Sequence, residues 1–218
     1  MKVSMKSIAA AAFMLYSRVA TAAAPNVTAV SIGTVCTSFP GYPGFGGSGA
    51  GPFIGIAAST GQAIDGIGLN VAYYMDETRR YGYVAAWTSF PMSNIPLRCF
   101  NQTLEAQLKI GPDSEEIWQP LVISGDPALK GALGFGFPED KYPNIPVEAY
   151  WHFVNGEQVP GVFLGAKDST TFGFVYNQAG LLGSAGEYYV LRLLGTEGFT
   201  KWELTVRDTV GFLQVTYD

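Results

Sequence analysis

His152 is the only histidine in the chain, so it is the one side chain of ordinary pKa that could act as a general base near neutral pH. It lies in an aromatic stretch beside Tyr150 and Trp151. A Ser–His–Asp triad would have to use it as the base, since triads assemble from residues that are distant in sequence. No G-x-S-x-G motif marks a nucleophile. A hydrolase that uses His152 and a purely structural His152 both remain open.

The sequence offers no recognisable metal centre or paired-carboxylate site. One histidine cannot build a multi-histidine zinc site, and no H-E-x-x-H, EF-hand or P-loop motif is present. Glycosidases need two opposed carboxylates, whereas Glu115–Glu116 and Glu139–Asp140 are adjacent pairs in turn-like segments. We interpret these pairs as solvated loop charges and predict no metal and no cofactor.

Arg192 is an unusual charge within the apolar run Tyr188–Leu194. A guanidinium among apolar neighbours needs a partner, because a buried charge without one is costly. It could bind an anionic or carbonyl oxygen of a ligand, or it could pair with a buried acid or extend to water. The residues around it do not decide between a binding role and a structural one.

Aromatic residues make up 14% of the chain, and in the stretch 147–177 they occupy both faces of the expected strands. This exceeds what one sheet face needs, so a ligand cavity inside a sandwich or barrel would use the surplus. Packing of one sheet on another would use the same residues. The candidate catalytic residues are His152, Arg192 and Tyr150, and the candidate substrate-binding residues are Trp87, Trp151, Tyr176 and Phe174.

The stretch 147–177 should form three antiparallel strands. Asn155-Gly156 lies between strand-like runs, and this pair favours the type I′ turn of a two-residue hairpin. Residues 167–170 (Lys-Asp-Ser-Thr) indicate a second reversal. The rest of the chain should add strands around this sheet.

Other segments have a period of two residues, which is typical of half-buried strands. In Leu97–Ile110 the alternation places Leu104, Ala106 and Leu108 inward. Gln62–Met75 and Thr200–Val206 are also expected to be strands. Turn signals recur at about 8–12 residues, as in sandwiches and barrels. We therefore predict an all-β fold, an antiparallel sandwich or barrel of about a dozen short strands, with residues 25–218 forming a single domain.

Residues 1–24 have the pattern of a signal peptide. Lys2 and Lys6 form a basic start, Ile8–Tyr16 is apolar but too short to span a bilayer, and small residues fit cleavage near 22–24. An uncleaved anchor is the alternative. Cleavage would leave 10 basic and 18 acidic residues, a net charge of −8, so we predict no nucleic-acid partner. No later apolar run approaches 18 residues, so we also predict no membrane span in the mature chain.

Cys36 and Cys99 are the only cysteines. In an oxidising compartment such a pair is expected to form a disulfide, and two free buried thiols are the alternative. Asn26 and Asn101 begin the N-glycosylation sequons Asn-Val-Thr and Asn-Gln-Thr. These features predict a protein of the secretory pathway or the extracellular space.

The chain also resembles the fungal hetero-Diels–Alderases of tropolone-sesquiterpenoid biosynthesis. The features that carry the resemblance are the leader MKSIAAAAFMLY, the Cys36 and Cys99 pair, the sequons at Asn26 and Asn101, and the aromatic body around VEAYWHFVNG. It implies a cofactor-independent cycloaddition between a tropolone o-quinone methide and humulene or a similar apolar terpene. The family has no short signature in this sequence, so the resemblance assigns no catalytic residue.

An aromatic cavity with few polar groups suits such a reaction, because a cycloaddition needs two apolar partners held face to face and donors aimed at the carbonyl. The expected partners are therefore small apolar organic substrates. The alternative is a noncatalytic secreted cell-wall or carbohydrate-binding β-sandwich protein, which would use exposed aromatic side chains as sugar platforms. The sequence does not indicate the oligomeric state.

Overall fold

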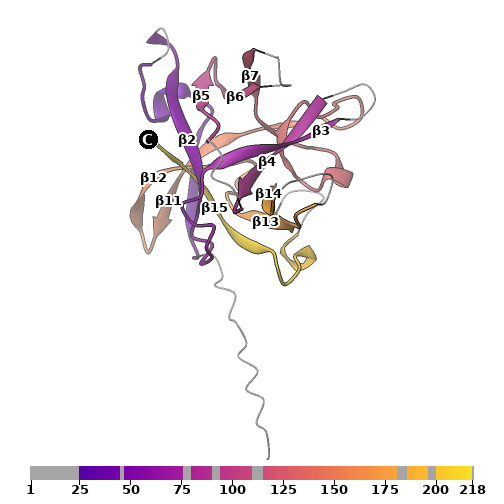
Figure 1. The fold of residues 1–218 in the computed structure, drawn as a ribbon. Coiled ribbons are helices and arrows are strands. Elements are labelled where there is room, and N and C mark those ends of the chain that lie inside the picture. Colours follow the sequence, from indigo (N-terminus) through magenta and orange to yellow (C-terminus); the bar gives the residue numbers. More distant parts are fainter. Residues whose placement is uncertain are drawn as a thin grey trace, which may run out of the picture.

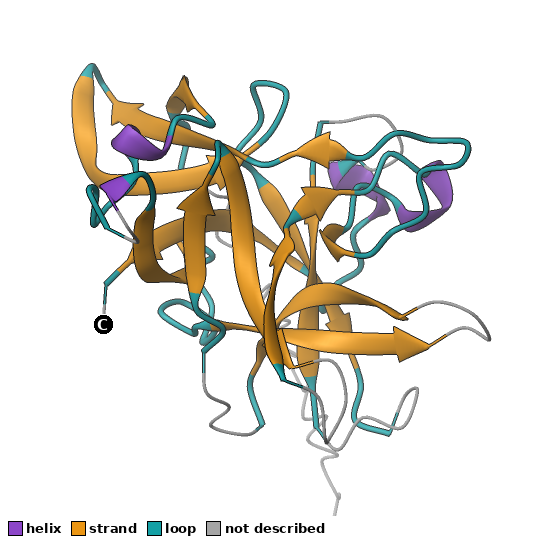
Figure 2. Cartoon of the chain, turned by 90° about the horizontal axis from the view of Figure 1, so that it is seen from above, coloured by secondary structure: helices purple, strands orange, loops and turns teal. Residues whose placement is uncertain are grey.

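The computed structural model describes residues 25–44, 47–75, 80–89, 94–109, 115–180, 186–195 and 200–217. The predicted signal peptide, residues 1–24, lies outside this part of the chain. Strands dominate the described residues, and the helices among them are single 3₁₀ turns at Cys36–Ser38 (η1), Pro127–Leu129 (η3) and Lys201–Glu203 (η5). Figure 2 shows the strands in orange and these short helical turns in purple. The predicted all-β, antiparallel, single-domain fold is confirmed.

The described residues form 15 strands in one branched antiparallel sheet. The strands are β1 Thr28–Gly33, β2 Ala50–Ala58, β3 Leu69–Met75, β4 Arg80–Trp87, β5 Leu97–Phe100, β6 Thr103–Lys109, β7 Glu116–Pro120, β8 Val122–Ile123, β9 Leu133–Phe135, β10 Ile145–Pro146, β11 Glu148–Val154, β12 Glu157–Gly165, β13 Phe172–Asn177, β14 Tyr188–Leu193 and β15 Thr209–Thr216. The main path runs β10-β8-β9-β4-β14-β13-β15-β2-β5-β6-β7, and β10 and β7 do not pair with each other. The sheet is not closed, so it fits a sandwich or open fold better than a barrel.

The C-terminal strand β15 joins the branches of the sheet (Figure 1). Its first residues, Thr209–Gly211, pair with the start of β13, and Leu213–Val215 pair with β12. Strand β2 pairs with β15 on the opposite edge, at Phe212–Thr216. Strands β12 and β13 therefore follow one another along the same edge of β15. The prediction that residues 147–177 form three neighbouring strands is wrong in its third member, because β13 pairs with β15 and β14 and not with β12.

Both predicted reversals in this stretch are confirmed. Asn155 and Gly156 have φ angles of 52° and 85°, and Val154 pairs with Glu157 across the turn. Positive φ at both central positions is the type I′ geometry expected of Asn-Gly. Lys167 and Asp168 also have positive φ, 48° and 60°, within the turn from Ala166 to Ser169. The segment 165–171 therefore folds back on itself between β12 and β13.

The main hydrophobic core draws its side chains from many of the strands. Phe53, Phe172 and Phe174 are each at most 2% exposed there. The alternation predicted for β6 is confirmed, since Leu104, Ala106 and Leu108 are buried and the intervening residues are not. A second apolar cluster, which includes Tyr83, Phe137 and Tyr188, packs together apart from the main core. Aromatic residues outside the stretch 147–177 therefore supply this second cluster.

Three predicted strands differ from the structure. A two-residue turn at Asn101 and Gln102 divides Leu97–Ile110 into β5 and β6, and Ile110 lies outside the described residues. Strand β3 starts only at Leu69, because the segment before it forms turns in which Asp65 accepts hydrogen bonds from the Thr60 and Gly61 amides. Thr200–Val206 is not a strand.

Residues 200–203 instead form a capped 3₁₀ turn. Glu203 Oε2 accepts a hydrogen bond from the Thr200 amide at 2.8 Å and one from its hydroxyl at 3.1 Å. The Glu203 backbone in turn contacts the Thr200 side chain, and the two contacts form a capping box, which favours a helical start over an extended chain. The alternation of apolar residues in this segment was therefore misleading.

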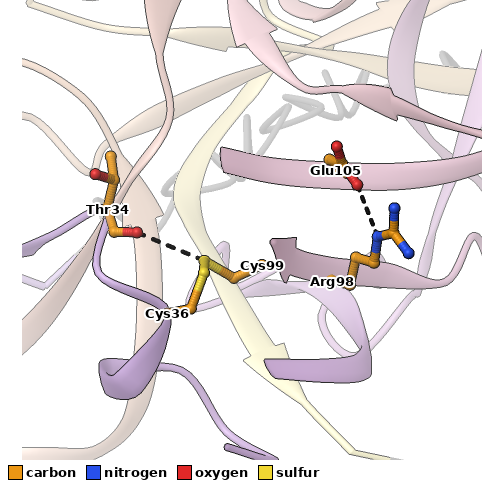
Figure 3. Close-up of a disulfide and its surroundings, with 5 residues drawn as sticks. All are labelled: Thr34, Cys36, Arg98, Cys99 and Glu105. Carbon is orange, nitrogen blue, oxygen red and sulfur yellow. Dashed lines mark hydrogen bonds and ion pairs between the residues drawn. A yellow bond between two sulfur atoms is a disulfide. The ribbon is translucent and has the colours of Figure 1, made fainter. Parts of the chain in front are cut away.

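The predicted disulfide joins Cys36 to Cys99, with 5.3 Å between their Cα atoms (Figure 3). It fastens η1 to β5. On β5 the neighbouring Arg98 extends away from the disulfide, and its Nε lies 2.7 Å from Glu105 Oε2 on β6. Among the described residues, the helices are all too short to cross a membrane.

Candidate functional site

A surface cleft of about 500 Å³ lies beside the segment that leads into β15. Its volume is within the range of about 300–1,000 Å³ that small-molecule sites occupy. The lining residues are Gln62, Tyr189 and the consecutive residues Leu204, Thr205, Val206, Arg207, Asp208 and Thr209. Apolar side chains, hydroxyl groups and one guanidinium therefore meet in a single cleft.

The cleft is shaped by a turn over residues 205–208. The Asp208 amide donates to the Thr205 carbonyl at 3.2 Å, and the Thr205 amide donates to Asp208 Oδ2 at 2.7 Å. Val206 is consequently held at the tip of the turn, where its side chain is 95% exposed. The turn presents an apolar side chain to solvent beside the polar groups of the cleft.

Asp208 also fastens this turn to the sheet. Its Oδ1 accepts a hydrogen bond from the backbone amide of Tyr176, on β13, at 2.7 Å. The carboxylate is 8% exposed, so each of its oxygens holds one backbone amide in a largely dry setting. Residues 32 positions apart in sequence are thereby fixed next to one another.

Arg207 lies over the aromatic ring of Tyr176, with 3.5 Å from its guanidinium carbon to the ring centroid. Its Nη2 is 3.6 Å from Glu187 Oε1, and the Tyr176 hydroxyl donates to the same carboxylate oxygen. Stacking and the ion pair hold the guanidinium in place while about half of the side chain, 55%, stays exposed. Because a guanidinium has five N–H donors, further donors are available to an oxygen in the cleft.

Tyr176 and Tyr189 lie next to Arg207 and Glu187, and the two tyrosine rings meet edge to face with 5.5 Å between their centroids. The hydrogen bond to Glu187, followed by burial, raises the pKa of Tyr176 above its usual 10. Burial raises the pKa of Tyr189, and the nearby Arg207 charge opposes that rise. Both phenols are therefore protonated at neutral pH and can donate hydrogen bonds.

His152, predicted as a candidate catalytic residue, lies in the core. Its side chain is 1% exposed, its ring stacks on Phe163 at 3.7 Å, and Nε2 lies 2.8 Å from Thr170 Oγ1. Burial lowers its pKa from 6.5 to about 4, so the ring is neutral at physiological pH. It is not among the residues that line the cleft.

Tyr150 is fully buried near His152. Its hydroxyl donates to Glu148 Oε2 at 2.8 Å and accepts from the Asp168 amide at 3.1 Å. Burial and then the Glu148 hydrogen bond raise the pKa of this phenol strongly. Together with the His152–Thr170 contact, these bonds attach the segment between β12 and β13 to β11, which is a structural task.

Arg192 and Trp87 belong to the region of the second apolar cluster. Arg192 Nη1 donates to the backbone carbonyl of Leu129, so a main-chain oxygen is one partner of this charge. Trp87 stacks on Tyr188 at 4.6 Å. Its Nε1 is buried without a hydrogen-bond partner.

The remaining predicted binding residues are scattered. Phe174 is fully buried in the main core, whereas Trp151 is 39% exposed and pairs across strands with Val30 on β1. Tyr176 is the one member of the predicted set that contacts Arg207 at the cleft. The structure therefore does not gather the predicted site residues into one pocket.

The sequence interpretation missed Arg207 and Tyr189. Arg207 was overlooked because residues 200–206 were expected to continue as a strand. The pattern Thr200-x-x-Glu203 was the available signal, since Thr or Ser followed three residues later by Glu marks a capping box. Nothing in the sequence indicated that Gln62 and Tyr189 would join this segment.

Within the described ranges, no group of three or more His, Cys, Asp or Glu side chains is arranged to hold a metal ion. No protein-family model matches the sequence, and no curated protein matches it either.

Proposed function

We propose that the protein is a cofactor-independent hetero-Diels–Alderase and that the cleft beside residues 204–209 is its reaction site. The observation that supports this proposal is the immobilised Arg207 guanidinium, which shares one cleft with the apolar side chains of Leu204 and Val206. A protein that accelerates a cycloaddition between an o-quinone methide and an alkene would use this combination. The combination provides a donor for one oxygen and an apolar surface for the hydrocarbon partner.

The reaction forms two bonds and releases nothing. The carbonyl oxygen of the quinone methide bonds to one alkene carbon, and the exocyclic carbon of the quinone methide bonds to the other. The ring of the quinone methide thereby regains its aromatic character. In the proposal Arg207 and Tyr189 donate hydrogen bonds to that oxygen. They withdraw electron density from the heterodiene and stabilise the charge that develops on the oxygen.

In the proposal the apolar side chains of the cleft, Leu204 and Val206, bind the terpene. Leu204 and Val206 offer hydrocarbon surface, and burying the alkene against them removes apolar area from water. Holding both reactants in one orientation converts a bimolecular encounter into an effectively unimolecular step. It also presents one face of the heterodiene to the alkene, which would give a single enantiomer of the product.

The proposal is tested with purified protein, a quinone-methide precursor and humulene. We expect cycloadduct to form faster than in buffer and in large enantiomeric excess. Racemic product at the background rate would refute the proposal.

The proposed place of action is the secretory pathway or the extracellular space. The disulfide between Cys36 and Cys99 supports it, since such bonds persist mainly in oxidising compartments. The predicted signal peptide and the sequons point in the same direction.

A noncatalytic wall-binding function is the second candidate. The exposed Trp151 favours it, because an indole that is 39% exposed, beside Val30 on β1 that is 43% exposed, could pack against a sugar ring. This function predicts retention on glucan or chitin that Trp151→Ala abolishes. If the protein is retained on glucan or chitin and does not accelerate the cycloaddition, this second function is selected over the first.

A further inference from the structure

We propose that Asn101 carries an N-linked glycan whose first sugar packs on the ring of Phe100 and stabilises the β5–β6 hairpin. This inference concerns a modification site and its structural task. It depends on passage through the secretory pathway and does not depend on the reaction proposed for the cleft.

The sequon lies in the tightest kind of hairpin turn. Asn101 and Gln102 have φ angles of 48° and 62°, and Phe100 pairs directly with Thr103. Positive φ at both central residues defines a two-residue type I′ turn. Asn101 and Gln102 are exposed, so the Asn101 amide extends into solvent.

The three residues that the glycan contact needs therefore lie within this four-residue turn. Phe100 supplies an aromatic ring, Asn101 supplies the amide nitrogen, and Thr103 supplies the hydroxyl that completes the sequon. Side chains that face each other across an antiparallel pair have Cβ atoms about 4.5–5.5 Å apart. A sugar on Asn101 would start next to this pair.

The ring of Phe100 also contacts Arg98 on the same strand. The guanidinium carbon of Arg98 lies 4.9 Å from the ring centroid, and Arg98 is held in turn by Glu105 Oε2 at 2.7 Å. Arg98 precedes Phe100 by two residues, so it approaches the ring from the body of the strand. Asn101 lies on the turn side, and Phe100 is only partly buried.

An N-acetylglucosamine has a face of C–H groups that is apolar. Packing that face on an aromatic ring removes water from both surfaces, and the positive edge of the C–H bonds meets the negative face of the ring. Because the two-residue turn has little conformational freedom, little additional ordering is needed for this contact. The glycan is therefore expected to stabilise the folded state.

The covalent step is the usual one for this modification. The Asn101 amide nitrogen attacks C1 of a lipid-diphosphate-linked oligosaccharide, a C–N bond forms, the C–O bond to the diphosphate breaks, and the amide nitrogen loses one proton. No oxidant or reductant is consumed.

The second sequon provides an internal control. Asn26 is also exposed, but it follows Pro25 and lies two residues before the start of β1. The residue before it is proline where Asn101 has Phe100, and neither Asn26 nor Val27 has the positive φ of a type I′ turn. A sugar on Asn26 should therefore not contribute comparably to stability.

The experiment uses the full chain secreted from a glycosylating eukaryotic host, with each glycan trimmed enzymatically to one N-acetylglucosamine. Intact mass reports occupancy at each sequon in the wild-type protein, Asn101→Gln and Asn26→Gln. Thermal unfolding is then compared for wild type, Asn101→Gln, Phe100→Leu and the double variant. The four proteins form a cycle that isolates the contact between sugar and ring.

We expect Asn101 to be occupied and its loss to lower Tm by about 2–4 °C, the shift that a contact of about 1 kcal/mol gives in a domain of this size. In the Phe100→Leu background the loss should have at most about a third of this effect, and Asn26→Gln should leave Tm within about 1 °C. An unoccupied Asn101, or an equal Tm change with and without Phe100, would overturn the proposal. If Phe100→Leu does not fold, the sugar protons of the wild-type protein should still show upfield ring-current shifts in NMR spectra, and unshifted protons would overturn it.

This outcome can be separated from the outcome for the cleft. The turn of the β5–β6 hairpin and the segment leading into β15 occupy opposite ends of the molecule (Figure 1). Removal of the Asn101 glycan should therefore leave the cycloaddition rate of the folded protein unchanged.

Discussion

The guanidinium carbon of Arg207 lies 3.5 Å from the centre of the Tyr176 ring. This is well within the distance of about 6 Å at which a cation and an aromatic ring attract each other. The Glu187 carboxylate holds both partners, since it accepts the Tyr176 hydroxyl and pairs with Arg207. A flexible surface arginine is thereby converted into a positioned donor at the edge of the cleft. The proposed reaction depends on this positioning.

Replacing Arg207 should therefore impair catalysis more than folding. Arg207→Gln removes the charge and the stacked donor, and we expect the cycloaddition rate to fall about 10–100-fold. This is less than the loss of about 100–1,000-fold on removing a donor from a buried oxyanion site, because Arg207 is half exposed. Arg207→Lys should recover part of the rate, since it retains the charge without the planar stacking. The measurement is the initial rate with both substrates at saturation. Lys201→Gln is the matched control, and an equal loss in that variant would contradict the assigned role.

Asp208 should matter for stability. Its two oxygens accept the amides of Tyr176 and Thr205 at 2.7 Å each, and Asp208→Asn would turn an NH₂ group toward one of them. An unsatisfied buried amide costs about 1–3 kcal/mol, so the free energy of unfolding in urea should fall by that amount. Glu157→Gln, on the exposed Asn155-Gly156 hairpin, should stay within about 0.5 kcal/mol of wild type. Equal stability of Asp208→Asn and wild type would show that the turn does not need this carboxylate.

His152 should make stability depend on pH. The unfolded chain binds a proton at His152 near pH 6.5, whereas the folded chain binds one only near pH 4. Between these values the unfolded state holds more protons, so stability falls as pH decreases from 6.5 to 4, by up to about 3 kcal/mol. His152→Gln keeps a hydrogen-bonding group for Thr170 but does not titrate, and it should lack this component. The difference between the two urea-unfolding curves across pH isolates His152 from the nearby carboxylates of Glu148 and Asp168, and parallel curves would contradict the shift.

Removing the disulfide should destabilise the protein strongly. Cys36 and Cys99 are 63 positions apart, and a crosslink that closes a loop of this size contributes about 4 kcal/mol in the chain-entropy model. The double variant Cys36→Ala/Cys99→Ala should lose about this much free energy of unfolding in urea. A loss below about 1 kcal/mol would indicate that the unfolded chain is already constrained here.

Local features of the fold were predictable because they depend on neighbouring residues. Asn155-Gly156 specifies its own turn, and the alternation of Leu104, Ala106 and Leu108 specifies the buried face of β6. The Cys36–Cys99 bond followed from there being only two cysteines. Each of these needs little information from the rest of the chain.

The arrangement of strands was not predictable in the same way. Strand β15 lies between β2 on one edge and β12 and β13 on the other, and the residues with which it pairs are 35 or more positions away in sequence. Periodicity identifies a strand and its buried face but does not identify its neighbour. The predicted three-stranded unit failed at β13 for this reason.

The candidate site was less predictable than the fold. Gln62, Tyr189 and Arg207 come together only through the pairing of β2, β13, β14 and β15. Conversely, the chemical distinctiveness of His152 suggested catalysis, whereas the structure gives it a core contact with Phe163 and Thr170. A reactive residue type marks a site only where the fold also provides space and access.

The most direct test of the central claim is a crystal structure of the protein soaked with the cycloadduct. The account predicts product density in the cleft, with the former carbonyl oxygen within hydrogen-bonding distance of Arg207 or Tyr189 and the terpene portion against Leu204 and Val206. Product bound instead at another surface, such as that around Trp151, with the cleft empty, would contradict it.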